Sequence, residues 1–510
     1  MSENRTLDHT GTISGEARAV EHVRHLKNND SAAEEHRQSA TGAARMRSGS
    51  LYSPRDIVKS GLCIGCGSCA AQAQLQGIDA AMNFDAYGLY KPEGPASWYK
   101  QPSERFSQTC PFSPRARKED ELSVWNFPET IQESDTVGRF QTAFVGHVLE
   151  RDFRLQGSSG GMVTWVASEL LRKGLIDGVA HVVAVKEPHQ DGRFFKYRIS
   201  RSQEELNEGA KSRYYPVELS DMLRTIKETP GRYAVVALPC MIKAVQLLRQ
   251  EDPVFRERIS FTLGLFCGHM KSAHFAESFA WQMKVPFEQV AAVEYRYKYP
   301  DRPANWYNAM LRLNDGQQYN KDWWHLADGD WGAGFFMSNA CNFCDDVVSE
   351  TADVAFGDAW VEPYSSDGKG TNVVVARSIL VSRLIVDAIQ EGRLQLEEVD
   401  GAFVEQTQAA GFRQRREGLA YRLTWATEGI QPIKRVQPDA DRPERSRKVI
   451  YRTRYWISKW SHRMFWLAKK TGLPGIYLSW ARYAASFYHG IAYHKGNFSE
   501  MKKRLIEFKK

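Results

Sequence analysis

Residues 142–185 read TAFVGHVLERDFRLQGSSGGMVTWVASELLRKGLIDGVAHVVAV. Apolar and β-branched residues predict a strand over 142–149 and another over 179–185. Between them, apolar residues at helical spacing predict a helix over 162–172, directly after the glycine loop 157–161. The order strand, glycine loop, helix, strand is typical of an α/β fold.

A second unit of this kind follows further along the chain. Residues 233–239 predict a strand that leads to Cys240, residues 242–249 a helix, and residues 260–266 a strand that ends at Cys267. Both cysteines follow predicted strands, where α/β sheets usually place their chemistry. We therefore predict an α/β (α+β) fold with a mixed-sheet core, and the sequence does not give the order of the strands.

The chain has eight cysteines, which fall into two sets of four. The first set is Cys63, Cys66, Cys69 and Cys110. Three thiolates at a spacing of three residues, with a fourth from elsewhere, are typical of the ligands of a cubane [4Fe-4S] cluster, whereas structural zinc sites usually use two separated pairs. Gly65 and Gly67 favour the tight backbone path that this requires, because glycine has no Cβ to restrict φ.

The second set is Cys240, Cys267, Cys341 and Cys344. One Cys-x-x-Cys pair with two distant cysteines is compatible with zinc and with a second cluster, so the residues alone leave both alternatives open. The first residues of the chain start no apolar stretch of the kind that a secretory signal needs. We therefore expect a cytoplasmic protein whose cysteines stay reduced, which favours metal binding over disulfides.

Composition divides the chain into five parts. Residues 1–50 contain no Phe, Trp or Tyr and predict a disordered tail. Residues 51–135 hold the first cysteine set and a predicted hairpin over 82–92 with its turn at 85–88, and they predict a small ferredoxin-like iron–sulfur segment. The remaining parts are a catalytic core over 136–412, a linker over 413–444 and a helical extension over 445–510.

The extension is basic and aromatic. Residues 445–510 contain sixteen Lys or Arg against two acids, Glu500 and Glu507, although the whole chain has a net charge of only +7. Many of the aromatic residues are three or four positions apart, which predicts amphipathic helices, but 473–488 is too short and polar to span a membrane. Such helices could bind the surface of an anionic membrane, at the inner face of the cell membrane. They could equally pack against the acidic remainder of the chain or against a partner protein, and single-stranded nucleic acid is the least favoured alternative.

Seven motifs, in this order, give the chain a resemblance to a known family. The motifs are Ser158–Thr164, Lys211–Tyr215, Ala237–Cys240, Gly264–His269, Glu294–Lys298, Cys341–Asp345 and Asp353–Trp360. From about Cys63 to Phe412 the chain resembles the beta subunit family of coenzyme F420 hydrogenase and dehydrogenase. It is also similar to formate dehydrogenase beta subunits and to the plant reductase that acts on hydroxymethyl chlorophyll a.

The resemblance implies a FAD-dependent iron–sulfur oxidoreductase. It favours a second [4Fe-4S] cluster over zinc at the second cysteine set, and it implies electron flow between a one-electron carrier, such as ferredoxin or another redox protein, and a small-molecule acceptor of two electrons. The basic aromatic extension, if it holds the protein at a membrane, would favour a lipid-linked acceptor instead. Clusters move one electron at a time, whereas a flavin can collect two. Either direction of flow is open, and two alternatives remain: an electron-transfer subunit without its own substrate, and a zinc-stapled scaffold without activity.

The resemblance also assigns a flavin site to the glycine loop 157–161. Free N–H groups at the start of a helix suit a pyrophosphate, although the loop by itself is better explained as an ordinary N-cap, in which Ser158 or Ser159 caps the helix. The residues predicted to bind FAD are Ser158, Ser159, Gly160, Gly161, Thr164, Lys211, Ser212, Tyr214 and Arg296.

Three residues are predicted to serve the reaction. His269 is a candidate proton donor to the reduced acceptor, Lys298 a cationic contact of the cofactor, and Asp358 a residue that positions a hydrogen-bond network. Their ordinary alternatives are a loop histidine, a surface lysine and a turn-forming aspartate. No Ser-His-Asp order, HExxH motif or Walker loop supports a hydrolase or an ATPase.

Overall fold

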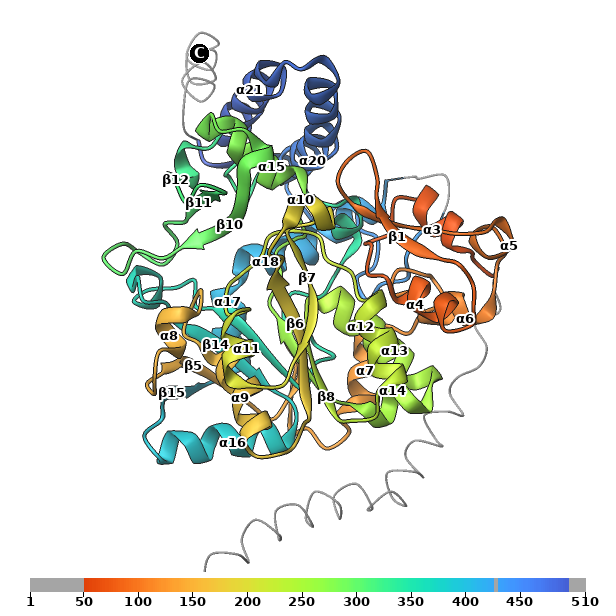
Figure 1. Cartoon of the computed structure of the whole chain (residues 1–510), viewed down its shortest axis with the longest axis vertical. Coiled ribbons are helices and arrows are strands. Elements are labelled where there is room, and N and C mark those ends of the chain that lie inside the picture. The colour runs from red at the N-terminus through yellow and green to blue at the C-terminus, as the bar shows by residue number, and fades with distance from the viewer. Residues whose placement is uncertain (1–49, 426–429, 495–510) are drawn as a thin grey trace, which may run out of the picture. The chain divides into compact units, whose positions relative to one another are not determined.

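The computed structural model describes residues 50–425 and 430–494 (Figure 1). Apart from Ser50, the tail predicted for residues 1–50 lies outside the described residues, as do residues 495–510 of the predicted extension.

An eight-stranded mixed sheet carries most of the core. Its strands are β5 (Thr142–Val148), β6 (Gly178–Ala184), β7 (Phe195–Ser200), β8 (Tyr233–Ala237), β9 (Ile259–Leu265), β13 (Val354–Asp358), β14 (Asn372–Ala376) and β15 (Leu394–Val399), in the order β15-β5-β14-β13-β9-β8-β6-β7. The pairs β6/β8, β8/β9 and β9/β13 are parallel. Because β5 and β13 are both antiparallel to β14, the carboxyl ends of β5, β6, β8, β9 and β13 meet at one edge. The predicted mixed α/β core is confirmed.

Helices cover both faces of this sheet. Along β8, Tyr233, Val235 and Ala237 belong to one hydrophobic cluster, whereas Ala234 and Val236 belong to another. This alternation places successive side chains on opposite faces. The first cluster includes residues of α12 (Ser220–Glu228) and α13 (Pro239–Glu251), and the second includes residues of α9 (Met162–Arg172) and α16 (Ile379–Gln390).

The N-terminal segment holds short elements around the first cysteine set. They are α3 (Pro54–Lys59), α4 (Ser68–Gln74), β1 (Ala81–Phe84), β2 (Tyr90–Glu93), α5 (Ala96–Tyr99), α6 (Glu104–Thr109), α7 (Glu119–Asn126), β3 (Gln132–Ser134) and β4 (Gly138–Phe140). The predicted hairpin is confirmed, since β1 and β2 pair antiparallel. Its turn forms because Asp85 Oδ1 accepts the N–H groups of Tyr87 and Leu89, and Gly88 takes a φ of +69°.

A second, three-stranded sheet follows the first half of the core. It consists of β10 (Val290–Tyr297), β11 (Asn308–Leu313) and β12 (Gln318–Asp322), and α15 (His274–Met283) contacts β11 and β12. The end of β10 carries two of the predicted site residues, Arg296 and Lys298.

Parts of the stretch predicted as a linker over 413–444 pack against the core, among the described residues 413–425 and 430–444. The stretch begins inside α18 (Ala409–Arg415) and continues through α19 (Glu417–Leu423). Lys434 lies in a buried ion pair, with its Nζ 3.0 Å from Asp345 Oδ1. Arg435 pairs with Glu350 in the same way, with 2.6 Å between Nη2 and Oε1, so basic side chains of this stretch neutralise buried acids of the core.

The C-terminal extension is a helical hairpin of α20 (Arg445–Thr471) and α21 (Pro474–Ala492), drawn in blue in Figure 1. Phe465 is fully buried and stacks on Trp281 with 4.2 Å between ring centroids. Ser461 Oγ accepts the N–H of Phe336, and Tyr477 donates to Asp328. The described part of the extension therefore packs against the core, which was one of the alternatives left open by the sequence.

None of the helices in residues 50–425 and 430–494 is long and apolar enough to cross a membrane.

Candidate functional site

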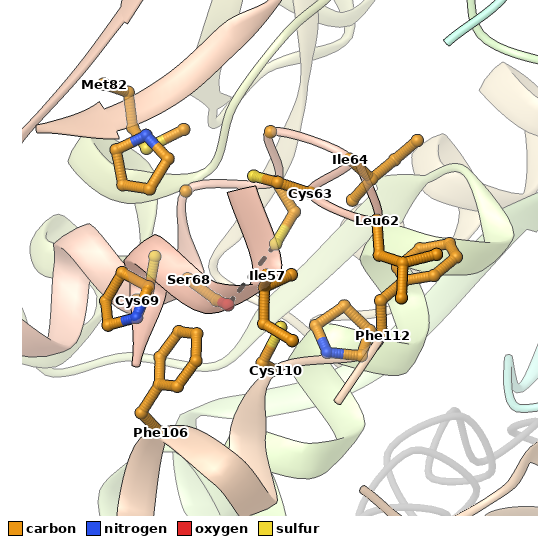
Figure 2. A pocket seen from close by; sticks show the side chains of 16 residues that line it. Ile57, Leu62, Cys63, Ile64, Ser68, Cys69, Met82, Phe106, Cys110 and Phe112 are labelled. Atoms are coloured by element: carbon orange, nitrogen blue, oxygen red, sulfur yellow. Dashed lines mark hydrogen bonds between the residues drawn. The ribbon is translucent and has the colours of Figure 1, made fainter. Parts of the chain in front are cut away.

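The first four cysteines converge on one pocket. Cys63 and Cys66 lie in the loop after α3, Cys69 lies in α4, and Cys110 caps the carboxyl end of α6. All four line a pocket whose other walls are mainly apolar, and Figure 2 shows Cys63, Cys69 and Cys110 around it. The sequence prediction that these residues form one set agrees with this arrangement.

Two glycines make this tight path sterically feasible. Gly65 and Gly67 have φ values of +77° and +82°, which L side chains rarely adopt. A Cβ on Gly65 would lie 2.6 Å from Tyr90 O, and one on Gly67 would lie 2.4 Å from Glu218 Oε2. Both positions therefore require glycine for conformation and for space.

The second four cysteines converge on another pocket. Cys240 lies in the first turn of α13, Cys267 follows β9, and Cys341 and Cys344 lie in and just after a short 3₁₀ helix. Pro239 at the start of α13 and the carboxyl end of β9 bring the first two together at the same sheet edge. All four line the pocket, together with Leu238, Pro239, Met270 and Arg415.

The two pockets are neighbours. Ile64 and Phe112 line both of them, so a single layer of two apolar side chains lies between the two sets of thiols. Burial and the other cysteines of the second set raise the pKa of Cys240 most strongly. The charge of Cys66 in the first set raises it as well, by a smaller amount. Nothing in the spacing of the sequence predicted this shared wall.

The thiols are free, and all eight cysteines are buried or half-buried. None of the eight cysteines forms a disulfide. Burial raises the pKa of Cys66 to about 11 and that of Cys341 to about 11, and burial with the neighbouring Cys66, Cys63 and Cys110 raises the pKa of Cys69 further. Thiolates therefore need compensating cations here, and bound iron or zinc ions would supply them. No three His, Cys, Asp or Glu side chains in the described residues are grouped so as to hold a single metal ion.

Arg415 is the charged side chain in the wall of the second pocket. It lies at the end of α18 and is only 3% exposed. Its Nη2 donates to the carbonyl oxygens of Cys267 and Gly268, at 2.9 and 2.8 Å. Sequence analysis missed this residue, because it lies far along the chain from the cysteines and in no recognisable motif.

The predicted flavin-binding loop lies beyond β5 and is held in place by neighbouring segments. Ser158 Oγ accepts the N–H of Ser212, and Ser159 donates to the carbonyl of Thr371. Gly161 has a φ of +89°, and a Cβ there would lie 2.6 Å from Phe153 C. Gly160 is equally confined, with a hypothetical Cβ 2.8 Å from Gly146 O.

The ordinary N-cap alternative receives no support, because Gly161 is the N-cap of α9 and no side chain caps it. The N–H of Met162, in the first turn, instead donates to the sheet residue Asn372, at 3.1 Å from its Oδ1. Thr164 lies in the same helix and is half-buried.

Lys298 joins three segments at this place. Its Nζ donates to the carbonyl oxygens of Arg154, Ser159 and Lys369, at 2.8, 3.2 and 2.8 Å. Burial, and then the charge of Lys211, lower the pKa of Lys298 to about 7. Lys211 itself pairs with Glu294, with 3.1 Å between Nζ and Oε1.

Arg296 and Asp358 form a buried ion pair, with 2.9 Å between Arg296 Nη1 and Asp358 Oδ2. The guanidinium lies 4.3 Å from the ring centroid of Tyr307. Burial has the largest effect on the pKa of Tyr214 and raises it, and the charge of Arg296 has the next largest effect and lowers it. Two residues that the sequence suggested separately are thus partners, and Tyr307 is a member of the group that the sequence did not indicate.

An aromatic bridge links this polar group to the second pocket. The ring of Tyr214 lies 4.8 Å from that of Trp331, and Trp331 stacks on His269 at 4.1 Å. His269 is two residues beyond Cys267. Burial, followed by the charge of Lys271, holds the pKa of His269 well below its ordinary value, and its role as proton donor stays a prediction.

Comparison with known proteins identifies the family. Two family models match, both described as coenzyme F420 hydrogenase/dehydrogenase, beta subunit: the model of its N-terminal part matches residues 143–224, and the model of its C-terminal part matches residues 231–402. A search of the curated proteins finds no match to the chain. Among solved structures, one similar chain comes from the F420-reducing [NiFe] hydrogenase complex of Methanosarcina barkeri, with 16% identity, a TM-score of 0.45, and coverage of 59% of this chain and 98% of that chain. The two family matches follow one another along the sheet and include the glycine loop, the end of β10 and the second cysteine set, and the chain belongs to the coenzyme F420 hydrogenase/dehydrogenase beta subunit family.

Proposed function

We propose that the chain is an iron–sulfur flavoprotein oxidoreductase that relays electrons between a one-electron donor, such as ferredoxin, and a two-electron acceptor. The observation that carries this proposal is the pair of four-thiol pockets that share Ile64 and Phe112 as walls. Family membership supports the oxidoreductase class.

Each set of thiols fits a [4Fe-4S] cluster in number and ligand type. When bound, such clusters supply one-electron transfer, and a flavin gathers two electrons for the acceptor. The walls of both pockets are mainly apolar, and Ile64 and Phe112 belong to both walls, so the route between the two sets of thiols runs past apolar side chains. The aromatic bridge Tyr214–Trp331–His269 continues this route toward the polar group around Arg296.

We propose FAD binding beside the glycine loop. Three basic side chains, Lys211, Arg296 and Lys298, lie beside the loop, where Glu294 and Asp358 hold the first two in place. An anionic diphosphate or a reduced flavin would favour the charged form of Lys298, whose pKa is lowered to about 7. The ion pair with Asp358 would hold Arg296 in a fixed orientation. Asp358 is therefore proposed as a positioning residue for the cofactor group.

The test of the proposal is the content of iron, acid-labile sulfide, zinc and flavin in protein purified without oxygen. We expect about eight irons with matching sulfide and one FAD per chain. About four irons with one zinc would reassign the second set to structure, and the absence of both iron and flavin would leave the scaffold alternative.

Reconstitution separates an enzyme from a subunit. Purified protein with reduced ferredoxin would reduce a candidate acceptor by itself if it has its own substrate. If turnover requires a partner protein, the chain is the electron-transfer subunit of a complex.

Replacement of Lys298 should weaken flavin binding. Lys298→Met removes one ammonium and leaves three carbonyl oxygens without their donor, so the glycine loop loses its anchor. A charged hydrogen-bonding group of this kind contributes about 1.5–3 kcal/mol, so we expect the dissociation constant of FAD to rise about tenfold or more. Titration of flavin-depleted protein, followed by flavin fluorescence, measures it.

Lys196→Met is the matched control, because Lys196 pairs with Asp191 and its side chain is 42% exposed. The control should bind FAD like the unaltered chain. Equal affinities for the Lys298 variant and the control would contradict the proposed location of the flavin.

Contact with a membrane surface stays a prediction. The hairpin of α20 and α21 exposes Trp456, Trp460, Trp466 and Tyr483. Its packing against the core accounts for the buried face of the hairpin and leaves this outer surface unexplained.

A further inference from the structure

The two thiol pockets differ in charge. The residues that line the first pocket are cysteines, a serine, glycines and apolar side chains, and none of them is charged. The second pocket has the same apolar character but includes the guanidinium of Arg415.

Arg415 is held in place by hydrogen bonds from one guanidinium nitrogen, whereas another of its nitrogens has no hydrogen-bond acceptor among the described residues. Two hydrogen bonds from Nη2 to the backbone of Cys267 and Gly268 fix the guanidinium beside the thiols. Its Nη1 is buried and has no hydrogen-bond partner among the described residues. A buried donor without an acceptor is costly, and that of a charged group more so, which points to an anionic acceptor in the pocket.

The neighbouring acids do not cancel this charge completely. Asp345 pairs with Lys434 and lies close to Arg435, at 3.0 and 3.5 Å. Glu350 pairs with Arg435 and Arg416. Among the described residues, neither of these acids nor Asp346 forms a salt bridge with Arg415, whose guanidinium lines the pocket together with Cys267, Cys341 and Cys344.

We propose that Arg415 donates through Nη1 to a sulfur of the cluster in the second pocket and raises the reduction potential of that cluster above that of the first. This inference rests on the proposed function. Hydrogen bonds to cluster sulfurs and the local net charge both set the potential, and a fixed cation favours the reduced, more negative state.

The consequence is a direction for the internal electron step. One electron leaves the reduced first cluster and enters the oxidised second cluster, so that the first is oxidised and the second is reduced, and no bond or proton changes place. Electrons supplied to the first cluster by a one-electron donor protein would therefore collect next to His269 and Trp331.

The test is a redox titration of the anaerobically purified holoprotein, followed by electron paramagnetic resonance. In Arg415→Gln we expect the ratio of reduced to oxidised second cluster, at a given potential, to fall at least tenfold, which is a shift of 59 mV for one electron. The potential of the first cluster should stay unchanged. Arg415→Lys keeps the charge but loses the forked geometry and should fall between the two.

Arg377→Gln is the matched control for the loss of a buried arginine. Arg377 is 1% exposed and donates to the backbone carbonyls of Val137, Val348 and Ala352, but it lines neither pocket. This variant should leave both potentials unchanged.

The outcomes separate the inference from the function beneath it. If the unaltered protein holds only about four irons, the second cluster and the proposed function fail. If it holds about eight irons and the potentials in Arg415→Gln and Arg415→Lys equal those of the unaltered protein, the inference alone fails. If Arg415→Gln loses the second cluster, the titration of Arg415→Lys decides, since an unshifted potential there would overturn the proposal.

Discussion

Cys240→Ser should remove one cluster and leave the other. Cys240 lies in the first turn of α13, where Pro239 and the preceding strand fix its direction toward the second pocket. We expect iron to fall from about eight to about four per chain, with a matching loss of sulfide, because a serine oxygen is a poor substitute for a thiolate at iron. Iron and sulfide analysis of anaerobically purified protein measures this.

Electron transfer should fall with the iron. If the second cluster lies between the first and the flavin, the rate at which a reduced donor reduces FAD should fall by at least about 100-fold. Replacing a residue that only orients a metal ligand already lowers activity by up to about 100-fold, and the loss of a ligand should cost at least as much. Cys69→Ser is the complementary variant, since it alters the first set. Retention of all iron in Cys240→Ser, or unchanged flavin reduction after its loss, would contradict a relay through both pockets.

Phe465→Ala should destabilise the protein strongly. The ring is fully buried between Trp281, Phe336 and Tyr477, with centroids 4.2, 5.3 and 5.1 Å away. Truncation of a buried phenylalanine typically costs about 3–5 kcal/mol, because it removes apolar contacts and leaves a cavity. Chemical denaturation of the holoprotein, followed by tryptophan fluorescence, measures the change in the unfolding midpoint.

The adjacent Trp466 provides the control. Its side chain is 39% exposed, and its nearest charged contact is Lys470, 5.9 Å from the ring centroid. Trp466→Ala should cost no more than about 1 kcal/mol. Similar effects of the two substitutions would mean that the hairpin does not share a core with the rest of the protein.

The sequence was most informative where local pattern sets structure. The predicted helix over 162–172 coincides with α9, and the predicted strands over 142–149 and 260–266 differ from β5 and β9 by one residue at their ends. Period and glycine placement act over a few residues, so they are readable without the fold. The two cysteine sets were equally readable, because ligand chemistry restricts the residue type.

Contacts between distant segments were less accessible. The strand order, the partner of Arg296 and the position of Arg415 depend on how the sheet brings residues together that are far apart in the chain. Within the stretch predicted as a linker, only the fold shows that Lys434 pairs with Asp345. Composition cannot distinguish a solvated charge from a paired one.

The late position of Arg415 along the chain bears on biosynthesis. All four thiols of the second pocket leave the ribosome before α18, which carries Arg415, and before α20, whose Arg454 donates to the carbonyl of Gly332. Because synthesis runs from the N-terminus, and domains generally fold as units, the wall of the pocket is complete only after Arg415 has been synthesised. A cluster of the kind proposed for this pocket would therefore meet a more open set of thiols on the nascent chain than in the finished protein.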